Sequence, residues 1–137
     1  MSINSATPQD TLDHTIGAGA TSWSWYIGTA KEYYGDWPTG DTPDDWSVTL
    51  VMENPLEDGT VRVELTHKAV MSAARYVIGN ADKTWQYRPE GRVYMAFSGD
   101  LIRECRNLIF SADEADLDAV VADELIQVVA FRTVHFG

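Results

Sequence analysis

Residues 46–79 read WSVTLVMENPLEDGTVRVELTHKAVMSAARYVIG and contain the clearest patterning in the chain. Bulky apolar residues alternate with other residues over 46–52 and again over 61–65, as they do in strands with one buried face. The joining segment carries Pro55 and an Asp-Gly pair, which favours an antiparallel hairpin. Thr66 can then cap a helix over 67–78, whose apolar residues follow a helical spacing and which Gly79 ends.

The next segment repeats this order of hairpin and helix. Residues 84–87 and 93–97 are predicted as paired strands, and the sequence RPEGR at 88–92 between them fits a type I turn. Ser98 can cap a second helix that continues to Ile109. Its apolar stripe includes Cys105, while Arg103 and Arg106 face outward.

The last third of the chain has two possible endings. The acids of SADEADLD at 111–118 can complement a helix N-terminus, and a helical stripe runs from Leu117 to Val129 with a possible restart at Asp123. Residues 129–136 alternate well enough to form a short strand instead.

The N-terminal third has weaker signals. Residues 1–21 are rich in Ser, Thr, Gly, Asp and Pro and lack a periodic apolar pattern, so they are predicted as an N-terminal arm or an irregular cover. Alternation of Ser and Trp predicts a short strand over 22–27. Residues 28–45 hold too many glycines, prolines and acids for regular structure and are predicted as a long surface loop.

Together these elements predict an α+β fold, with a small, mostly antiparallel sheet built from hairpins and packed by two to three helices. A chain of 137 residues with 45% hydrophobic content is sufficient for one core. We therefore expect a single α+β domain over 22–137 that follows the 1–21 arm.

The charge is divided into three blocks. Up to Asp58 the chain has ten acids and a single lysine. Residues 59–110 contain eight Lys and Arg and five acids, and the residues from 111 onward contain six acids and one arginine, Arg132. The blocks carry −9, +3 and −5, which sum to the net charge of −11. Such a chain repels a polyanion, so direct binding of nucleic acid is not expected. The middle arginines are expected to pair with the protein's own two acidic segments or with an acidic patch of a partner.

No group of residues matches a catalytic, metal or phosphate-binding motif. His14, His67 and His135 lie far apart, and the acids at 113–118 lack the glycine and the spacing of an EF-hand loop. Cys105 lies on an apolar stripe, where a buried and unreactive thiol is expected. We predict no catalytic residue, no metal and no cofactor.

The first acidic block supports the sharpest functional hypothesis. Aromatic side chains inside an acidic rim can anchor a basic partner protein, while the negative field speeds encounter with it. The same surface would suit a DNA mimic that occupies the cationic groove of a nucleic-acid enzyme. The competing interpretation is an acidic surface that only keeps the protein soluble. The predicted partner-binding residues are Tyr34, Asp36, Trp37, Asp41, Asp44, Asp45, Glu57 and Asp58.

Four segments carry a family resemblance: LIRECRNLIFSADEADLDAVVADELIQVVAF at 101–131, TVHFG at 133–137, DDWSVTL at 44–50 and ELTHKAVMSAAR at 64–75. They resemble small acidic accessory proteins of actinobacterial phages and their hosts. The resemblance implies an intracellular accessory protein of phage or mobile-element type, and it transfers no functional residues.

We therefore expect a non-enzymatic acidic binding protein, an inhibitor of phage type that engages a basic surface of host nucleic-acid machinery. A host protein is the expected partner, rather than nucleic acid or a membrane. The single cysteine and the lack of a basic leader or a long apolar run favour the host cytoplasm. Two alternatives stay open: an assembly protein that self-associates through its apolar C-terminal segment, and a small hydrolase built around His67 or His135.

Overall fold

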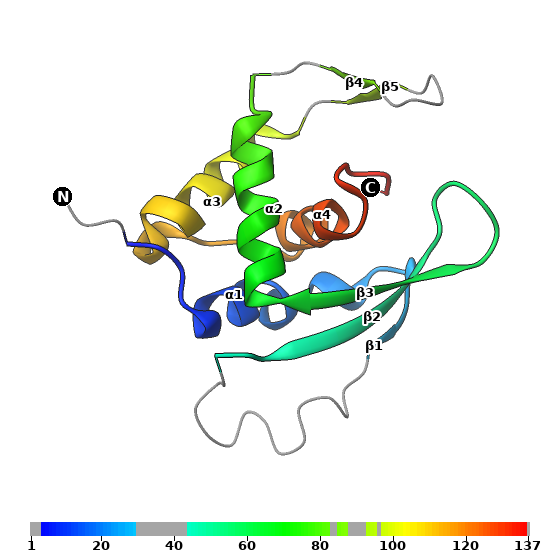
Figure 1. The fold of residues 1–137 in the computed structure, drawn as a ribbon, viewed down its shortest axis with the longest axis horizontal. Coiled ribbons are helices and arrows are strands. Elements are labelled where there is room, and N and C mark those ends of the chain that lie inside the picture. The colour runs from blue at the N-terminus through cyan, green and yellow to red at the C-terminus, as the bar shows by residue number, and fades with distance from the viewer. Residues whose placement is uncertain (1–3, 30–43, 83–84, 88–92, 96, 137) are drawn as a thin grey trace.

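A computed structural model describes residues 4–29, 44–82, 85–87, 93–95 and 97–136. The predicted α+β class is confirmed, and Figure 1 shows α2, α3 and α4 on one side of a three-stranded sheet. In chain order the elements are α1 (Pro8–His14), η1 (Ile16–Ala18), η2 (Ala20–Ser22), β1 (Tyr26–Thr29), β2 (Ser47–Glu53), β3 (Thr60–Thr66), α2 (His67–Gly79), β4 (Trp85–Tyr87), β5 (Val93–Met95), α3 (Gly99–Phe110), η4 (Ala112–Glu114) and α4 (Ala119–Phe131).

The three-stranded sheet is antiparallel in the order β1-β2-β3, which confirms the predicted hairpin. Its register places Val48 opposite Leu65 and Leu50 opposite Val63, and all four side chains are buried. The strand predicted over 22–27 begins only at Tyr26, because η2 occupies the preceding turn.

The second predicted hairpin forms a separate two-stranded sheet of β4 and β5. Its predicted turn at 88–92 lies outside the described residues, as do residues 30–43 of the predicted long loop.

Helices α2 and α3 begin as predicted. The Thr66 hydroxyl accepts a hydrogen bond from the Ala69 backbone N–H at 3.0 Å, and Ser98 accepts one from Leu101 at 3.1 Å. Each hydroxyl satisfies one of the N–H groups that a helix start leaves unpaired. Cys105 is fully buried on the core side of α3, as its position on the apolar stripe predicted.

Helix α4 forms the centre of the core and packs against α2, α3, η2 and β3. The Asp118 carboxylate caps it by accepting the Val121 N–H at 2.9 Å. The predicted restart at Asp123 is wrong, because the helix runs unbroken to Phe131. The alternative strand over 129–136 is also wrong: residues 129–131 are helical, and those that follow Arg132 form no strand.

The segment predicted as an N-terminal arm or irregular cover contains a helix, α1. Thr7 accepts a hydrogen bond from the Asp10 N–H at 3.2 Å, and Asp10 accepts one from the Thr7 N–H at 2.9 Å. Leu12 is fully buried, and the Trp46 indole donates to the Pro8 carbonyl at 2.7 Å. The segment covers the core, but it is not irregular, because a capping box starts a helix there.

Candidate functional site

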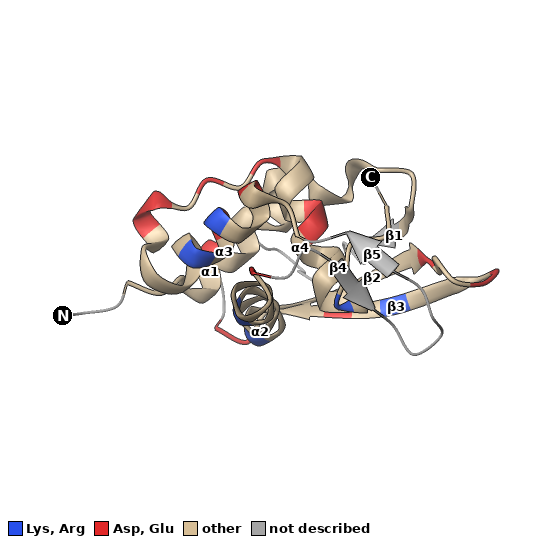
Figure 2. Cartoon of the chain, turned by 90° about the horizontal axis from the view of Figure 1, so that it is seen from above, with Lys and Arg blue, Asp and Glu red and all other residues tan. Residues whose placement is uncertain are grey.

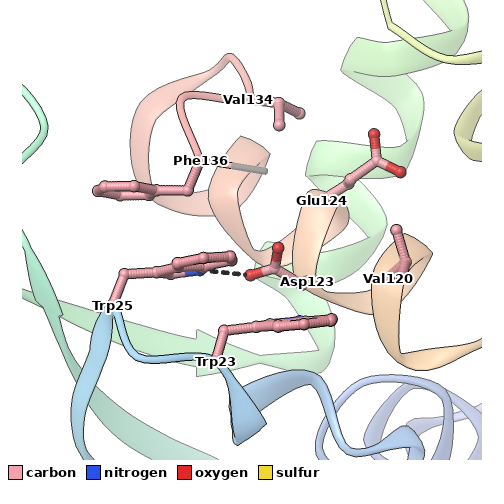
Figure 3. Close-up of a pocket in the computed structure, with 7 residues that line it drawn as sticks. All are labelled: Trp23, Trp25, Val120, Asp123, Glu124, Val134 and Phe136. Atoms are coloured by element: carbon pink, nitrogen blue, oxygen red, sulfur yellow. Dashed lines mark hydrogen bonds between the residues drawn. The ribbon is translucent and has the colours of Figure 1, made fainter.

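Three segments that are far apart in the sequence meet around a pocket of about 460 Å³ beside α4. The Trp25 ring stacks on Trp23 and on Phe136, with centroid distances of 5.5 and 5.3 Å and interplanar angles of 10°. Figure 3 shows these rings as parallel layers on one side of the pocket, facing side chains of α4 on the other. The remaining lining residues are Val120, Asp123, Glu124 and Val134.

Asp123 ties the aromatic side of the pocket to α4. Its Oδ1 accepts hydrogen bonds from the Trp25 indole at 2.9 Å and from the Tyr26 hydroxyl at 2.5 Å. Burial raises the pKa of Asp123, while the hydrogen bonds it accepts oppose that shift. Burial, and then Asp123 itself, raises the pKa of Tyr26, so the phenol stays a donor. Asp123 is 3% exposed and acts as a positioning residue for Trp25.

Gln127 holds the C-terminal segment against this site. Its Oε1 accepts the backbone N–H groups of His135 and Phe136 at 2.8 and 2.9 Å. Its Nε2 donates to the Phe136 carbonyl at 3.2 Å and to Asp123 Oδ2 at 2.9 Å. Gln127 is fully buried, so one side chain links the helix, the carboxylate and the wall that carries Phe136.

Glu124 is the pocket acid that a ligand can reach. Its side chain is half-buried and accepts a long hydrogen bond of 3.4 Å from the Ser98 hydroxyl. Burial raises the pKa of Glu124; the Ser98 hydrogen bond opposes this shift and the charge of Asp123 adds to it. No lysine or arginine in the described part of the chain forms an ion pair with it. Glu124 is therefore a partly desolvated carboxylate without a counter-ion among the described residues.

The structure describes four of the eight predicted partner-binding residues. Asp44 and Asp45 are exposed just before β2, and Glu57 and Asp58 are exposed in the turn that follows it. At about 3.3 Å per residue, the chain from Asp45 to Glu53 spans roughly 26 Å. The two acidic pairs therefore lie at opposite ends of β2 (Figure 1). The residues outside the described part are Tyr34, Asp36, Trp37 and Asp41.

Few of the acids that the structure describes have a counter-ion within the chain. Among the described residues, Arg103 is the only lysine or arginine in an ion pair, with Asp100 at 3.0 Å and Glu104 at 2.9 Å on its own helix. In that part of the chain, no middle arginine pairs with an acid of the two acidic blocks, because both partners of Arg103 belong to its own block. Arg132 instead lies over the Tyr76 ring at 5.2 Å. Figure 2 shows acids along the connection from α3 to α4 and at the β2–β3 turn.

The contacts of His67 and Cys105 are those of residues that support the fold. The His67 Nδ1 lies 3.0 Å from the hydroxyl of Thr11, a fully buried residue, and burial is the main cause that lowers the pKa of His67. Burial raises the pKa of Cys105 to about 12, which makes the thiolate scarce at neutral pH. Within the described ranges, no three His, Cys, Asp or Glu side chains are grouped so that they could hold a metal ion.

The pocket itself was not predicted from the sequence. The two tryptophans suggested only a strand with one buried face, and Asp123 suggested only a helix cap. One signal was available, since Asp123 and Glu124 interrupt the apolar run of α4. Acids inside such a run are buried only where the fold provides hydrogen-bond partners, and this points to a polar site.

None of the helices that the structure describes has both the length and the hydrophobicity needed to cross a lipid bilayer. Comparisons with protein-family models, curated proteins and solved structures found no match. The pocket and the distribution of charge are therefore the features from which a function can be inferred.

Proposed function

We propose that this chain is a non-enzymatic binding protein that engages a basic surface of a partner protein. The observation that carries the proposal is that most carboxylates of the described ranges have no counter-ion there. Within the described residues, only Asp100 and Glu104 pair with an arginine, in a chain whose net charge is −11. Unpaired acids create a negative field that attracts a basic protein and speeds its association.

Two exposed groups of acids are the proposed contact surfaces. The hairpin tip consists of Glu53, Glu57 and Asp58 around Leu56, whose side chain is 51% exposed. Leu56 supplies an apolar anchor inside a charged rim, which adds affinity to electrostatic steering. The second group is Asp44 with Asp45, which are exposed just before β2, at the other end of that strand.

A narrower form of the proposal is an inhibitor of phage type that acts in the host cytoplasm. It would occupy the cationic groove of a nucleic-acid enzyme, as a DNA mimic does. This form predicts that the partner loses its affinity for DNA or RNA when the complex forms.

The test starts with capture of partners from an actinobacterial lysate at low and high salt. The retained protein is purified and titrated against variants that each remove two charges. Two variants change opposite ends of β2, and the matched control changes two exposed acids elsewhere. The variants are Asp44→Asn with Asp45→Asn, Glu57→Gln with Asp58→Asn, and the control Asp13→Asn with Asp82→Asn.

We expect at least one β2 variant to weaken binding about tenfold at low salt, and the control to weaken it less than about threefold. Thermal midpoints should stay nearly unchanged, because all six acids lie outside the apolar core. Equal effects of all three variants, or capture of acidic proteins alone, would overturn the proposal.

The burial of most apolar side chains of α4 favours the binding proposal over the assembly alternative. The apolar residues Val121, Leu125, Ile126 and Val128 of α4 are buried within the monomer. Of the large apolar side chains of α4, Val120 is the one that is mostly exposed, at 52%.

A further inference from the structure

The pocket beside α4 combines two features that suit one kind of ligand. One side presents aromatic rings in parallel layers, and the other presents the half-buried carboxylate of Glu124. Figure 3 shows Glu124 projecting from α4 across the pocket from the rings. A flat cation could stack beside the aromatic layers and at the same time neutralise the carboxylate.

Ligands of three other kinds match the pocket less well, in charge or in shape. A neutral aromatic ligand could stack, but it would bury Glu124 further without compensating its charge. An anion would meet Glu124 directly, with Asp123 and its negative charge adjacent. A compact ammonium could pair with the carboxylate, but it offers no planar face to the rings.

A guanidinium group meets both requirements. It is planar, it stays charged at all ordinary pH values, and its N–H groups match the two oxygens of a carboxylate. A guanidinium also stacks on indole rings, and two of the rings that line the pocket, Trp23 and Trp25, are indoles. Asp123 cannot compete for it easily, since three donors of the protein already occupy its oxygens.

We propose that this pocket binds the guanidinium group of an arginine residue presented by a basic partner protein, with Glu124 as its counter-ion and Trp23, Trp25 and Phe136 as its stacking surface. The partner as the source of the arginine rests on the proposed function. Recognition of the guanidinium rests on the pocket alone. The acids on the surface would bring the partner close, and the pocket would then select one of its arginines.

The test uses a short capped peptide, acetyl-Gly-Arg-Gly-amide, with its lysine counterpart and free arginine as comparison ligands. Binding is followed by the indole N–H signals of Trp23 and Trp25 in two-dimensional NMR spectra. Glu124→Gln removes the charge with little change of shape. Glu114→Gln makes the same change at an exposed glutamate of η4, outside the pocket and the proposed contact surfaces, and is the matched control.

We expect the arginine peptide to shift both indole signals in a saturable way. Glu124→Gln should weaken that binding about tenfold, and the lysine peptide should bind several-fold more weakly. Glu114→Gln should change it less than about twofold, because exposed charges are screened by salt. Thermal midpoints no lower than that of the wild type would show that each variant is folded.

Three results would overturn the inference: no saturable shift, equal binding of the arginine and lysine peptides, or full binding by Glu124→Gln. Tighter binding of free arginine than of the peptide would overturn the partner protein as the source. The two proposals fail separately. Peptide binding without any captured basic partner removes only the proposed function, and partner binding that survives Glu124→Gln removes only this site.

Discussion

Replacing Gln127 with Met should release the C-terminal wall of the pocket while the core stays filled. Met is similar to Gln in size and flexibility, but it has no N–H group and only a weak acceptor. The substitution removes two hydrogen bonds that Oε1 accepts from the His135 and Phe136 backbone. It also removes the two that Nε2 donates to the Phe136 carbonyl and to Asp123.

The expected loss in the free energy of unfolding depends on whether each group that bonds to Gln127 can find water instead. The three bonds to the C-terminal segment contribute about 0.5–1.5 kcal/mol each, and the bond to the carboxylate about 1.5–3 kcal/mol. Backbone groups of the released segment can bond to water instead, whereas Asp123 stays buried with one donor fewer. We therefore expect the free energy of unfolding to fall by about 2 to 4 kcal/mol.

Urea unfolding followed by tryptophan fluorescence measures this loss, and hydrogen exchange of the His135 and Phe136 amides reports release of the segment. The control is Gln9→Met on α1, where an exposed side chain bonds Asp13 at 2.9 Å. It should change stability by less than about 0.5 kcal/mol. A loss below about 1 kcal/mol for Gln127→Met, with both amides still protected, would refute this account of the segment.

Three further predictions concern buried titratable groups. Glu124→Gln should stabilise the protein at neutral pH: burial raises the pKa of Glu124, so wild-type stability falls as pH rises from the ordinary glutamate range through the raised folded value. Urea midpoints of the two proteins should converge in acid. Glu104→Gln should act oppositely and cost about 1–3 kcal/mol at neutral pH, because burial raises the pKa of Glu104 but hydrogen bonds from Asp116, Arg103 and Asn107 lower it overall. The difference in unfolding free energy between this variant and the wild type should narrow as pH falls through the lowered pKa of Glu104. Finally, a thiol reagent should modify Cys105 only after unfolding, and rapid labelling of the native protein would contradict its burial.

The sequence predicted a helix or strand well where the residues that define it lie within a few positions of one another. Thr66 and Ser98 cap the helices expected of them, and the 46–65 alternation forms β2 and β3. Helix α1 was missed although Thr7 and Asp10 form a capping box, because the helix is short and its apolar side is small. Its place in the fold depends on contacts with residues far away in the sequence, such as the hydrogen bond from the Ala6 N–H to the Leu108 carbonyl at 2.7 Å.

The amino-acid sequence alone determined the fold class, the caps of α2 and α3, the burial of Cys105 and the net charge of −11. These properties depend on composition, on spacing along a helix or strand, and on hydrogen bonds to nearby residues. Only the tertiary structure decided which of the described acids have a counter-ion there, and that Asp123 would meet Trp25 across 98 positions of the chain. Those relations arise when α4 packs into the core and brings distant segments to its two sides, which no short-range pattern encodes.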